Sequence, residues 1–493
     1  MRNFLSLLLL FSAFGAHSKT IEVCSSCQYV NLVSAARVAQ PGDTILIRAG
    51  VYTNSNFIEN LQGKADRWIT ITSAPNEEVV FRGQTEAIHL SDPSYVEISN
   101  LIFEGQTGNG VNIDDGGTYE TPAKFIRIVN CQWRSMNATG NNDMLKLSGV
   151  DDFYVANCTF QNGSAGGSGI DMVGCHNGVI EKCRFINQGS NSIQTKGGSR
   201  NITIQKNLFA NGGQRSLNIG GSTGLEFFRP LNVDYEASEI FVYSNIFVGS
   251  LAPIAFVGAV DCRVVNNTLF LPTKWAIRIL QETTIERFQK CARNHFINNI
   301  VYIGNNAANP TINIGPNTAP ETFVFSNNLW YNRDNTNWTG PNLPVAETNS
   351  YVNIDPLIAT DPENGITIAK KSPAIGKGIF VENPREDYFG QLFNNPRSVG
   401  AIEINPPANL IENETNKLRV FLYPNPTSDY LTIYCLDCNK PKLVTVFNSV
   451  GEIISKSEIE CNSNMVDFDV RDYQEGLYFV KIGSLWLIFL VAR

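Results

Sequence analysis

Residues 145–172 read LKLSGVDDFYVANCTFQNGSAGGSGIDM, and this stretch decides the fold. It opens with Leu145-Lys146-Leu147 and closes with Ile170-Asp171-Met172, each a polar residue between two apolar ones. Side chains alternate between the two faces of a strand, so the apolar pair points inward and the polar residue outward. The same layout recurs at Ile88-His89-Leu90, Val111-Asn112-Ile113, Leu217-Asn218-Ile219, Ile277-Arg278-Ile279 and Ile312-Asn313-Ile314.

A second repeat places Asn or Cys near the end of each predicted strand, and an aromatic residue often follows two positions later. Such a period indicates one supersecondary unit per coil, stacked into a solenoid. Short strands between Gly, Asn and Ser turns predict an all-β parallel β-helix with a buried ladder. The ladder positions are Asn100, Cys131, Cys158, Cys183, Asn207, Asn245, Asn267, Asn299 and Asn328.

The chain of 493 residues is long enough for a large core and an accessory domain. Its net charge of −8 argues against a nucleic-acid partner. The chain has four histidines, which argues against His-based catalytic triads and metal sites. Eleven cysteines are too few for a disulfide scaffold, and we expect Cys24 and Cys27 to be structural. We expect a monomer.

Residues 1–19 have the pattern of a signal peptide. Arg2 precedes an apolar run over residues 4–11, which leads to the small residues Ala13, Gly15 and Ala16. The run is too short to span a bilayer, so we expect an exported chain without a transmembrane segment.

Residues 20–403 form the predicted β-helix domain. The sequence from Ala39 to Ile45, followed by Gly50-Val51-Tyr52, resembles the first coil of secreted right-handed β-helix proteins of the pectin lyase type that act on polysaccharides. Residues 372–403 resemble the closing segment of the same family, and a Pro/Asn/Glu-rich linker over residues 404–417 follows.

Residues 418–493 show a different pattern. Tyr423-Pro424-Asn425-Pro426 and Gly476-Leu477-Tyr478 together resemble the C-terminal sorting domain of the type IX secretion system. The resemblance implies a small β-sandwich and a translocon partner, and hence a secreted or cell-surface protein. Residues 485–491 are apolar but too short to span a membrane, so we expect a final strand.

The outer column of polar residues is the predicted site. Lys146, Asp171 and Lys196 follow at intervals of 25 residues, which predicts a ladder of alternating charge. The longest intervals between coils fall after Ile113, Ile219 and Ile279, so loops would wall this face into a groove. A groove suits an extended chain such as a polysaccharide. The alternative is an ordinary salt-bridged outer surface.

The segment from Gly169 to Gly221 resembles the central coils of pectin-degrading β-helix hydrolases. The positions of that family's other catalytic residues hold Ser168, Ser190-Asn191 and Gly213-Gln214-Arg215. The resemblance therefore supports the fold and not the hydrolase chemistry.

A supply of Lys and Arg over a groove instead favours β-elimination by a polysaccharide lyase acting on a uronate-containing, anionic polysaccharide. Such an enzyme must neutralise the carboxylate, remove the C5 proton and stabilise the resulting anion. We assign Lys196 as the base, and Arg215 or Arg278 as the neutralising cation. The remaining candidate substrate-binding residues are Lys146, Asp171, Asn218, Gln194, Arg229, Glu282 and Phe228.

No cofactor is required by the pattern, although Asp114, Asp115 and Asp143 are candidate Ca²⁺ ligands because hard oxygen ligands suit this ion. Two alternatives to the lyase stay open. One is a glycoside hydrolase that pairs Asp171 with Asp114, Asp115 or Glu282, and the other is a non-catalytic carbohydrate-binding protein. The sequence does not name the sugar or the linkage.

Overall fold

The computed structural model describes residues 18–118, 121–361, 365–404, 420–423, 427–435, 441–449, 451–460, 465–483 and 485–492. The chain divides into two compact units, residues 1–404 and 405–493. The predicted signal peptide falls almost wholly outside the described residues, as does most of the predicted linker. None of the described helices is long and apolar enough to cross a membrane.

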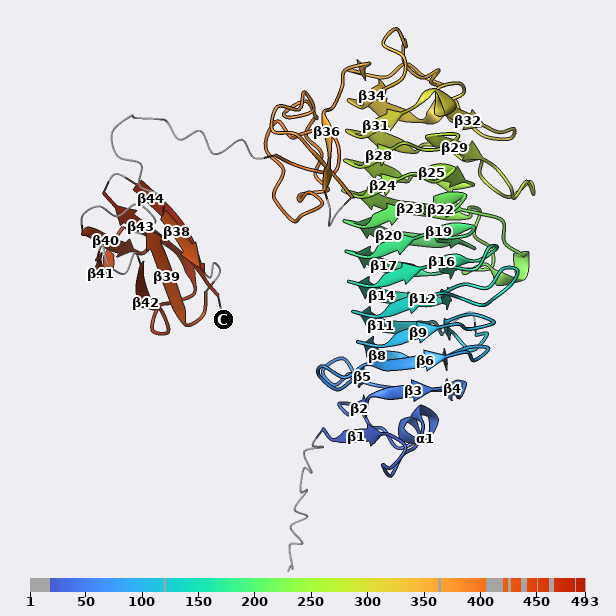
Figure 1. Cartoon of the computed structure of the whole chain (residues 1–493), viewed down its shortest axis with the longest axis horizontal. Helices are drawn as coiled ribbons and strands as arrows, with labels where there is room; N and C mark the ends of the chain where they lie inside the picture. Colours follow the sequence, from blue (N-terminus) through green and yellow to red (C-terminus); the bar gives the residue numbers. More distant parts are fainter. Residues whose placement is uncertain are drawn as a thin grey trace, which may run out of the picture. The chain divides into compact units, whose positions relative to one another are not determined.

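The first unit is a parallel β-helix whose coils stack from the blue to the yellow end in Figure 1. Each full coil passes through sheet C, then sheet A, then sheet B, and every strand pairs in parallel with its equivalent in the next coil. The hydrogen bonds therefore run along the stack, as a solenoid requires.

Sheet A consists of β1 (Thr20–Val23), β2 (Thr44–Ile47), β5 (Ile69–Ser73), β8 (Ser94–Ser99), β11 (Ala123–Val129), β14 (Val150–Ala156), β17 (His176–Glu181), β20 (Ser199–Gln205), β23 (Ala237–Tyr243), β26 (Ala259–Val260), β27 (Arg263–Val265), β30 (His295–Ile297) and β33 (Val324–Ser326). Sheet B consists of β3 (Gly50–Tyr52), β6 (Val79–Arg82), β9 (Ile102–Glu104), β12 (Gln132–Arg134), β15 (Thr159–Gln161), β18 (Arg184–Ile186), β21 (Leu208–Ala210), β24 (Ile246–Val248), β28 (Thr268–Phe270), β31 (Ile300–Ile303), β34 (Leu329–Asn332) and β35 (Tyr351–Val352). Sheet C consists of β4 (Asn56–Glu59), β7 (Ile88–Ser91), β10 (Val111–Asp114), β13 (Leu145–Ser148), β16 (Ser168–Val173), β19 (Asn191–Lys196), β22 (Arg215–Gly220), β25 (Ala252–Val257), β29 (Ile277–Leu280) and β32 (Ile312–Ile314). The short helices are α1 (Leu32–Ala36), η1 (Leu225–Phe227), η2 (Asn305–Ala307) and η3 (Pro320–Thr322).

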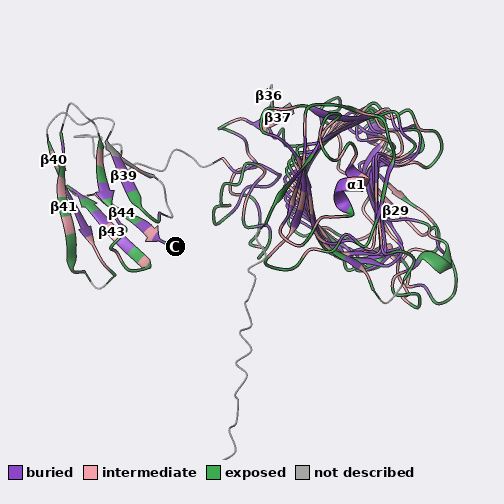
Figure 2. Cartoon of the chain, turned by 90° about the horizontal axis from the view of Figure 1, so that it is seen from below, coloured by how far each residue is buried: buried purple, intermediate pink, exposed green. Residues whose placement is uncertain are grey.

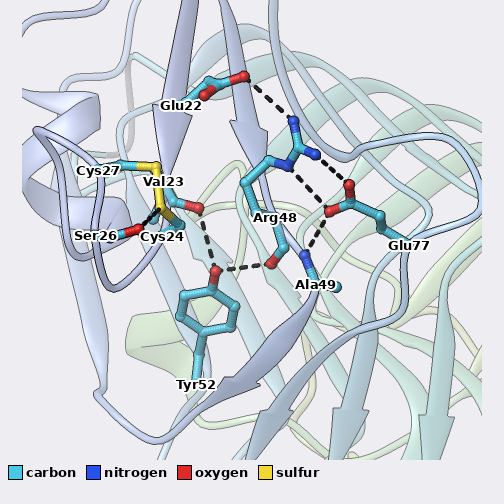
Figure 3. The surroundings of a disulfide bond; sticks show 9 residues. All are labelled: Glu22, Val23, Cys24, Ser26, Cys27, Arg48, Ala49, Tyr52 and Glu77. Carbon is cyan, nitrogen blue, oxygen red and sulfur yellow. Dashed lines mark hydrogen bonds and ion pairs between the residues drawn. A yellow bond between two sulfur atoms is a disulfide. The ribbon is translucent and has the colours of Figure 1, made fainter.

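The N-terminal end of the solenoid carries the short helix α1 and a disulfide. Asn31 caps α1 by accepting a hydrogen bond from the Ser34 amide at 2.9 Å. Cys24 and Cys27 form a disulfide beside β1 (Figure 3). The Tyr52 hydroxyl lies 3.2 Å from the Val23 carbonyl at the end of β1, which ties the first coil to this cap.

Buried apolar residues form one continuous core inside the coils. Figure 2 colours the buried residues purple on the ribbon in the view along the stack. Aromatic rings stack from coil to coil, with Phe160, Phe185 and Phe209 nearly parallel at centroid distances of 4.8 and 5.0 Å. Trp133 and Trp330 are fully buried, as their place in the repeat predicts. The stacking gives each coil the same width at this position.

The buried ladder follows the prediction over most of its length. Each asparagine accepts the backbone amide of the one before it: Asn207 N–H donates to Asn245 Oδ1 at 2.9 Å, and Asn267 N–H to Asn299 Oδ1 at 2.8 Å. The prediction for Asn100 is wrong, because strand pairing puts Leu101 in that position. Asn100 instead occupies the turn with φ +58°, a left-handed conformation that asparagine tolerates.

After the last coil the chain returns along the outside of sheet B. A hairpin of β36 (Ile358–Asp361) and β37 (Gly365–Ile368) and the segment up to residue 404 cover sheet B residues that would otherwise be exposed. Ile246 and Ile300 of sheet B pack there against Ile366 and Val399. The closing segment is therefore part of the first unit.

The second unit is a small antiparallel structure of two sheets. Its buried residues include Val444, Val480 and Phe489, which form a core of their own. The predicted final strand over residues 485–491 is confirmed. One sheet holds β38 (Val420–Tyr423), β39 (Tyr430–Cys435) and β42 (Met465–Asp469), and the other holds β41 (Ile453–Ile459), β40 (Lys442–Phe447), β43 (Gly476–Ile482) and β44 (Leu485–Val491).

Candidate functional site

The outer column lies on sheet C, and its register is fixed by strand pairing. It places side by side His89, Asn112, Lys146, Asp171, Gln194, Asn218, Ala255, Arg278 and Asn313. The expected column of Lys146, Asp171 and Lys196 is therefore wrong in its last member. Lys196 pairs with Val173, two residues further along β19 than the column residue Gln194.

The four charged groups at the centre of sheet C nevertheless lie together. Lys146 Nζ donates to Asp171 Oδ2 and lies 3.7 Å from Asp143 Oδ2. Lys196 Nζ lies 3.5 Å from Asp171 Oδ1. The side chain of Asp171 is 1% exposed, whereas those of Lys146 and Lys196 are 19% and 12% exposed. The carboxylates are thus buried beneath two ammonium groups that reach the surface.

The surroundings shift the pKa values of Asp143 and Lys146. Burial, with the repulsion of Asp171 added, raises the pKa of Asp143 from 3.8 to about 7. Burial lowers the pKa of Lys146, but the attraction of Asp171 and Asp143 outweighs it and holds this pKa above 10.5.

A pocket of about 320 Å³ opens above the two lysines, and we call it the lysine pocket. Lys146 and Lys196 line it from sheet C, while Thr223, Phe227 and Arg229 line it from the loop of residues 221–236. This loop follows β22, which is one of the three places where the sequence predicts an overhanging loop. The other two, residues 115–122 and 281–294, also connect sheet C to sheet A.

Glu236 anchors the loop, and no pattern in the sequence predicts this role. Its buried carboxylate accepts hydrogen bonds from the amides of Gly197 and Thr223, both at 3.0 Å, and from the hydroxyls of Thr223 and Thr283. Two of the three loops that follow sheet C are thereby joined by one side chain. A charged residue before a strand is common, and only the three-dimensional structure shows that it points inward.

Arg229 fixes the other end of the same loop. Its guanidinium makes two hydrogen bonds to Asp115, at 2.6 and 3.0 Å, and its carbonyl lies 3.2 Å from Nε2 of His176. Bidentate pairs of this kind are geometrically specific. Arg229 therefore holds the wall of the lysine pocket, with its own charge already paired.

A second group of cations lies further along sheet C. Arg215 donates to Asn218 Oδ1 at 3.0 Å and pairs with Glu282 at 2.8 Å. The Arg278 guanidinium lies 4.6 Å from the ring centre of Trp275, and burial, with Arg215 nearby, lowers the pKa of Arg278. Arg278 is three strands away from the strand of Lys196, about 14 Å at the usual strand spacing.

The predicted contact between Phe228 and a sugar fails for a physical reason. Phe228 is fully buried against Phe288 at a centroid distance of 5.1 Å, so it has no surface to offer a sugar. Its neighbour Phe227 is exposed and lines the lysine pocket instead.

The three aspartates predicted to bind Ca²⁺ do not converge. Asp114 pairs with His89 at 2.6 Å, Asp115 with Arg229, and Asp143 lies against Lys146. Within the part of the chain that the structure describes, no group of three or more His, Cys, Asp or Glu residues is arranged to hold a metal ion. The expected three-aspartate site is therefore not formed, because each carboxylate has its own cationic partner.

Comparisons with known proteins agree with this architecture. Residues 86–269 match the family model of the right handed beta helix region, and residues 421–485 match that of the secretion system C-terminal sorting domain. XylC, solved in complex with xylose, has a TM-score of 0.51 at 11% identity, with 78% of this chain and 98% of that chain covered. Pectate lyase Pel9A has a TM-score of 0.49 at 13% identity, with coverages of 79% and 98%. An alginate lyase from Paenibacillus sp. str. FPU-7 has a TM-score of 0.41 at 16% identity, with coverages of 63% and 97%. No curated protein matches the sequence.

These identities are low enough that the likeness to solved structures concerns the fold alone. The first unit is a right-handed parallel β-helix. The chain is a β-helix protein that ends in a sorting domain of the type IX secretion system, which marks it for export to the cell surface or beyond.

Proposed function

We propose that the β-helix unit is a polysaccharide lyase that cleaves an anionic, uronate-containing chain lying along sheet C. The observation that carries the proposal is the lysine pocket, whose floor presents the amino groups of two lysines while the nearby carboxylates are buried. Such a floor attracts a carboxylate and stabilises the negative charge that develops when the neighbouring C–H bond breaks.

The two lysines take different roles. Lys146 is held by Asp171 and Asp143, and its raised pKa keeps it cationic, so it neutralises the substrate carboxylate. Lys196 has a single, longer contact with Asp171, so its amine is held less tightly than that of Lys146 and, in its neutral form, serves as the base. It takes the proton from C5, the electron pair forms the C4–C5 double bond, and the C4 oxygen leaves.

Arg215 and Arg278 then bind carboxylates of sugars further along the chain. Arg278 is three strands from the strand of Lys196, and Arg215 pairs with Asn191, at the opposite end of β19 from Lys196, so neither arginine acts on the sugar that reacts. Gln194 and Asn218 lie between the two cation groups in the column, where their amides can contact hydroxyl groups of the same chain. This modifies the sequence-based assignment of the neutralising cation.

The proposal is tested by incubating the secreted protein with a panel of uronate polysaccharides and following the ultraviolet absorbance of the unsaturated product. Lys196→Ala should lower turnover by about 10²- to 10⁴-fold, the usual contribution of a general base. Lys124→Ala, an exposed lysine on β11 outside the pocket, is the matched control and should have no effect. Full activity of Lys196→Ala would show that the base is another residue.

A glycoside hydrolase is the second candidate, and one observation favours it. Asp143 and Asp171 are neighbouring carboxyl groups, and burial together with the charge of Asp171 raises the pKa of Asp143 to about 7. A glycoside hydrolase needs one carboxyl group with a raised pKa as its general acid. Against it, both carboxyls are buried beneath the lysines. Reducing ends without an absorbing double bond would identify this reaction, and binding without any product would identify a carbohydrate-binding protein.

A further inference from the structure

A larger cavity of about 710 Å³ lies on the outer face of sheet A, away from the column on sheet C. Thr203, Phe241, Tyr243 and Arg263 line it from three neighbouring strands, β20, β23 and β27. The closing segment supplies the opposite wall through residues 383–386. We call this cavity the sheet A pocket.

The floor of the sheet A pocket is aromatic. Strand pairing places Thr203, Phe241 and Arg263 side by side, and the rings of Phe241 and Tyr243 are stacked at a centroid distance of 5.9 Å. Burial raises the pKa of Tyr243 to about 12, so its hydroxyl stays protonated at neutral pH. Aromatic faces with a neutral hydroxyl beside them suit the flat, hydroxyl-bearing surface of a sugar ring.

The charges around this floor do not cancel. Its acidic side chains already have partners: Glu239 pairs with Arg200 at 2.7 Å, Asp261 with Arg293 at 2.9 Å, and Glu386 with Lys206 at 2.5 Å. Arg263 and Arg385 are exposed, and neither forms an ion pair with any carboxylate among the described residues. The charge of Glu382 also acts on Tyr243, so two arginines face one further carboxylate, and the charge left for a ligand is positive.

The wall is a fixed part of the fold. Arg397, only 5% exposed, donates to the carbonyls of Pro384 at 2.9 Å and Val381 at 2.7 Å. The Ser244 hydroxyl donates to the Glu386 carbonyl at 2.8 Å, which joins the wall to the strand end beside the floor. A cavity held open in this way loses little conformational entropy when a ligand enters.

We propose that the sheet A pocket is a second carbohydrate site, which stacks one anionic sugar ring on the half-buried Phe241, beside the mostly buried Tyr243, and binds its acidic group with Arg263 and Arg385. The site would hold the polysaccharide without cleaving it, at a place separate from the lysine pocket. The proposal shares with the proposed function only the anionic nature of the sugar, because it requires no chemistry on sheet C.

The test is isothermal titration calorimetry of the full secreted chain with oligosaccharides of galacturonate, mannuronate, guluronate and glucuronate, a sulfated galactan oligosaccharide and a neutral xylo-oligosaccharide. The Lys196→Ala background prevents turnover during the titration. In that background the double variant Arg263→Gln/Arg385→Gln should bind anionic oligosaccharides roughly 10- to 100-fold more weakly at the second site, the usual loss for hydrogen bonds to charged groups. Phe241→Ala should weaken the same site.

Arg127→Gln is the matched control, since Arg127 is an exposed arginine of the same sheet on β11, far from the pocket. Its affinities should equal those of the parent. Unchanged binding by the double variant, a preference for the neutral oligosaccharide, or no binding of any anionic oligosaccharide outside sheet C would overturn the proposal. Binding at the sheet A pocket without production of a double bond by the wild type would refute the lyase and leave this site standing.

Discussion

The asparagine ladder needs an acceptor at its last coil, and Glu347 provides it. Its Oε1 accepts hydrogen bonds from the backbone amide and the side-chain amide of Asn328, at 2.9 and 2.7 Å. Its Oε2 accepts from Trp330 Nε1 at 2.7 Å. Both donor residues are fully buried, so neither can find water if the carboxylate is lost.

The substitution Glu347→Gln keeps the size of this side chain and removes one acceptor. In one orientation of the new amide, its NH₂ group faces Trp330 Nε1, and in the other it faces the two donors of Asn328. Either way at least one buried donor meets another donor. A hydrogen bond to a charged group contributes about 1.5–3 kcal/mol, so we expect Glu347→Gln to lower the free energy of unfolding by about 2–3 kcal/mol.

Urea unfolding, followed by hydrogen exchange of the β33 to β35 amides, measures this loss. Because the coils of a solenoid can open separately, exchange should accelerate first in the last coils and only weakly near β13. Glu321→Gln is the control, as Glu321 is an exposed residue in the first turn of η3. A loss below about 0.5 kcal/mol, the range of ordinary surface substitutions, would refute the role of Glu347.

Three further perturbations test other parts of the molecule. Hydrogen bonds from His89 to Asp114 and Glu86 raise the pKa of His89 to about 9, so the stability that they contribute is complete below pH 6.5 and is lost as the pH rises through 9. After allowance for solvent screening we expect about 2 kcal/mol, measured as the difference between wild type and His89→Gln in unfolding at several pH values. Glu236→Ala leaves its four donors unpaired, and it should loosen residues 221–236 in limited proteolysis and lower any activity of the lysine pocket. Gly220→Ala should cost several kcal/mol in thermal unfolding, because its backbone has φ +99° and a Cβ atom would meet the Val257 carbonyl at 1.8 Å.

The period of the sequence predicts the buried ladder because side chains at this position have the same role in every coil. Cys158, Cys183 and Asn207 recur near one phase, since a buried ladder position admits only residues that are small or that accept a hydrogen bond from the backbone amide of the preceding coil. Glu347 lies outside this pattern. It stands in a loop after the last repeat, where no following coil exists to give it a phase.

The site is less predictable, and Lys196 shows the physical reason. In its coil the triplet is Ile193-Gln194-Thr195, and Thr195 fills the inward position that an apolar residue holds elsewhere. A threonine can be buried there because its hydroxyl accepts the Gly220 amide at 3.4 Å. Counting 25 residues from Asp171 therefore passes the true column residue and arrives two positions later. The mistake concerns register, and the lysine still reaches Asp171 because its long side chain bridges the offset.

The buried ladder and the lysine pocket are built from different parts of each coil, so substitutions in one should not affect the other. Glu347 acts on the ladder beside sheets A and B, whereas Glu236 acts on the loops that leave sheet C. A change at Glu347 should lower stability and leave the lysine pocket intact in the molecules that remain folded. A change at Glu236 should alter the pocket while the ladder keeps its hydrogen bonds. The repeated coils thus form a rigid scaffold. The loops after sheet C can vary in sequence, and hence in the ligand they bind, without destabilising the core.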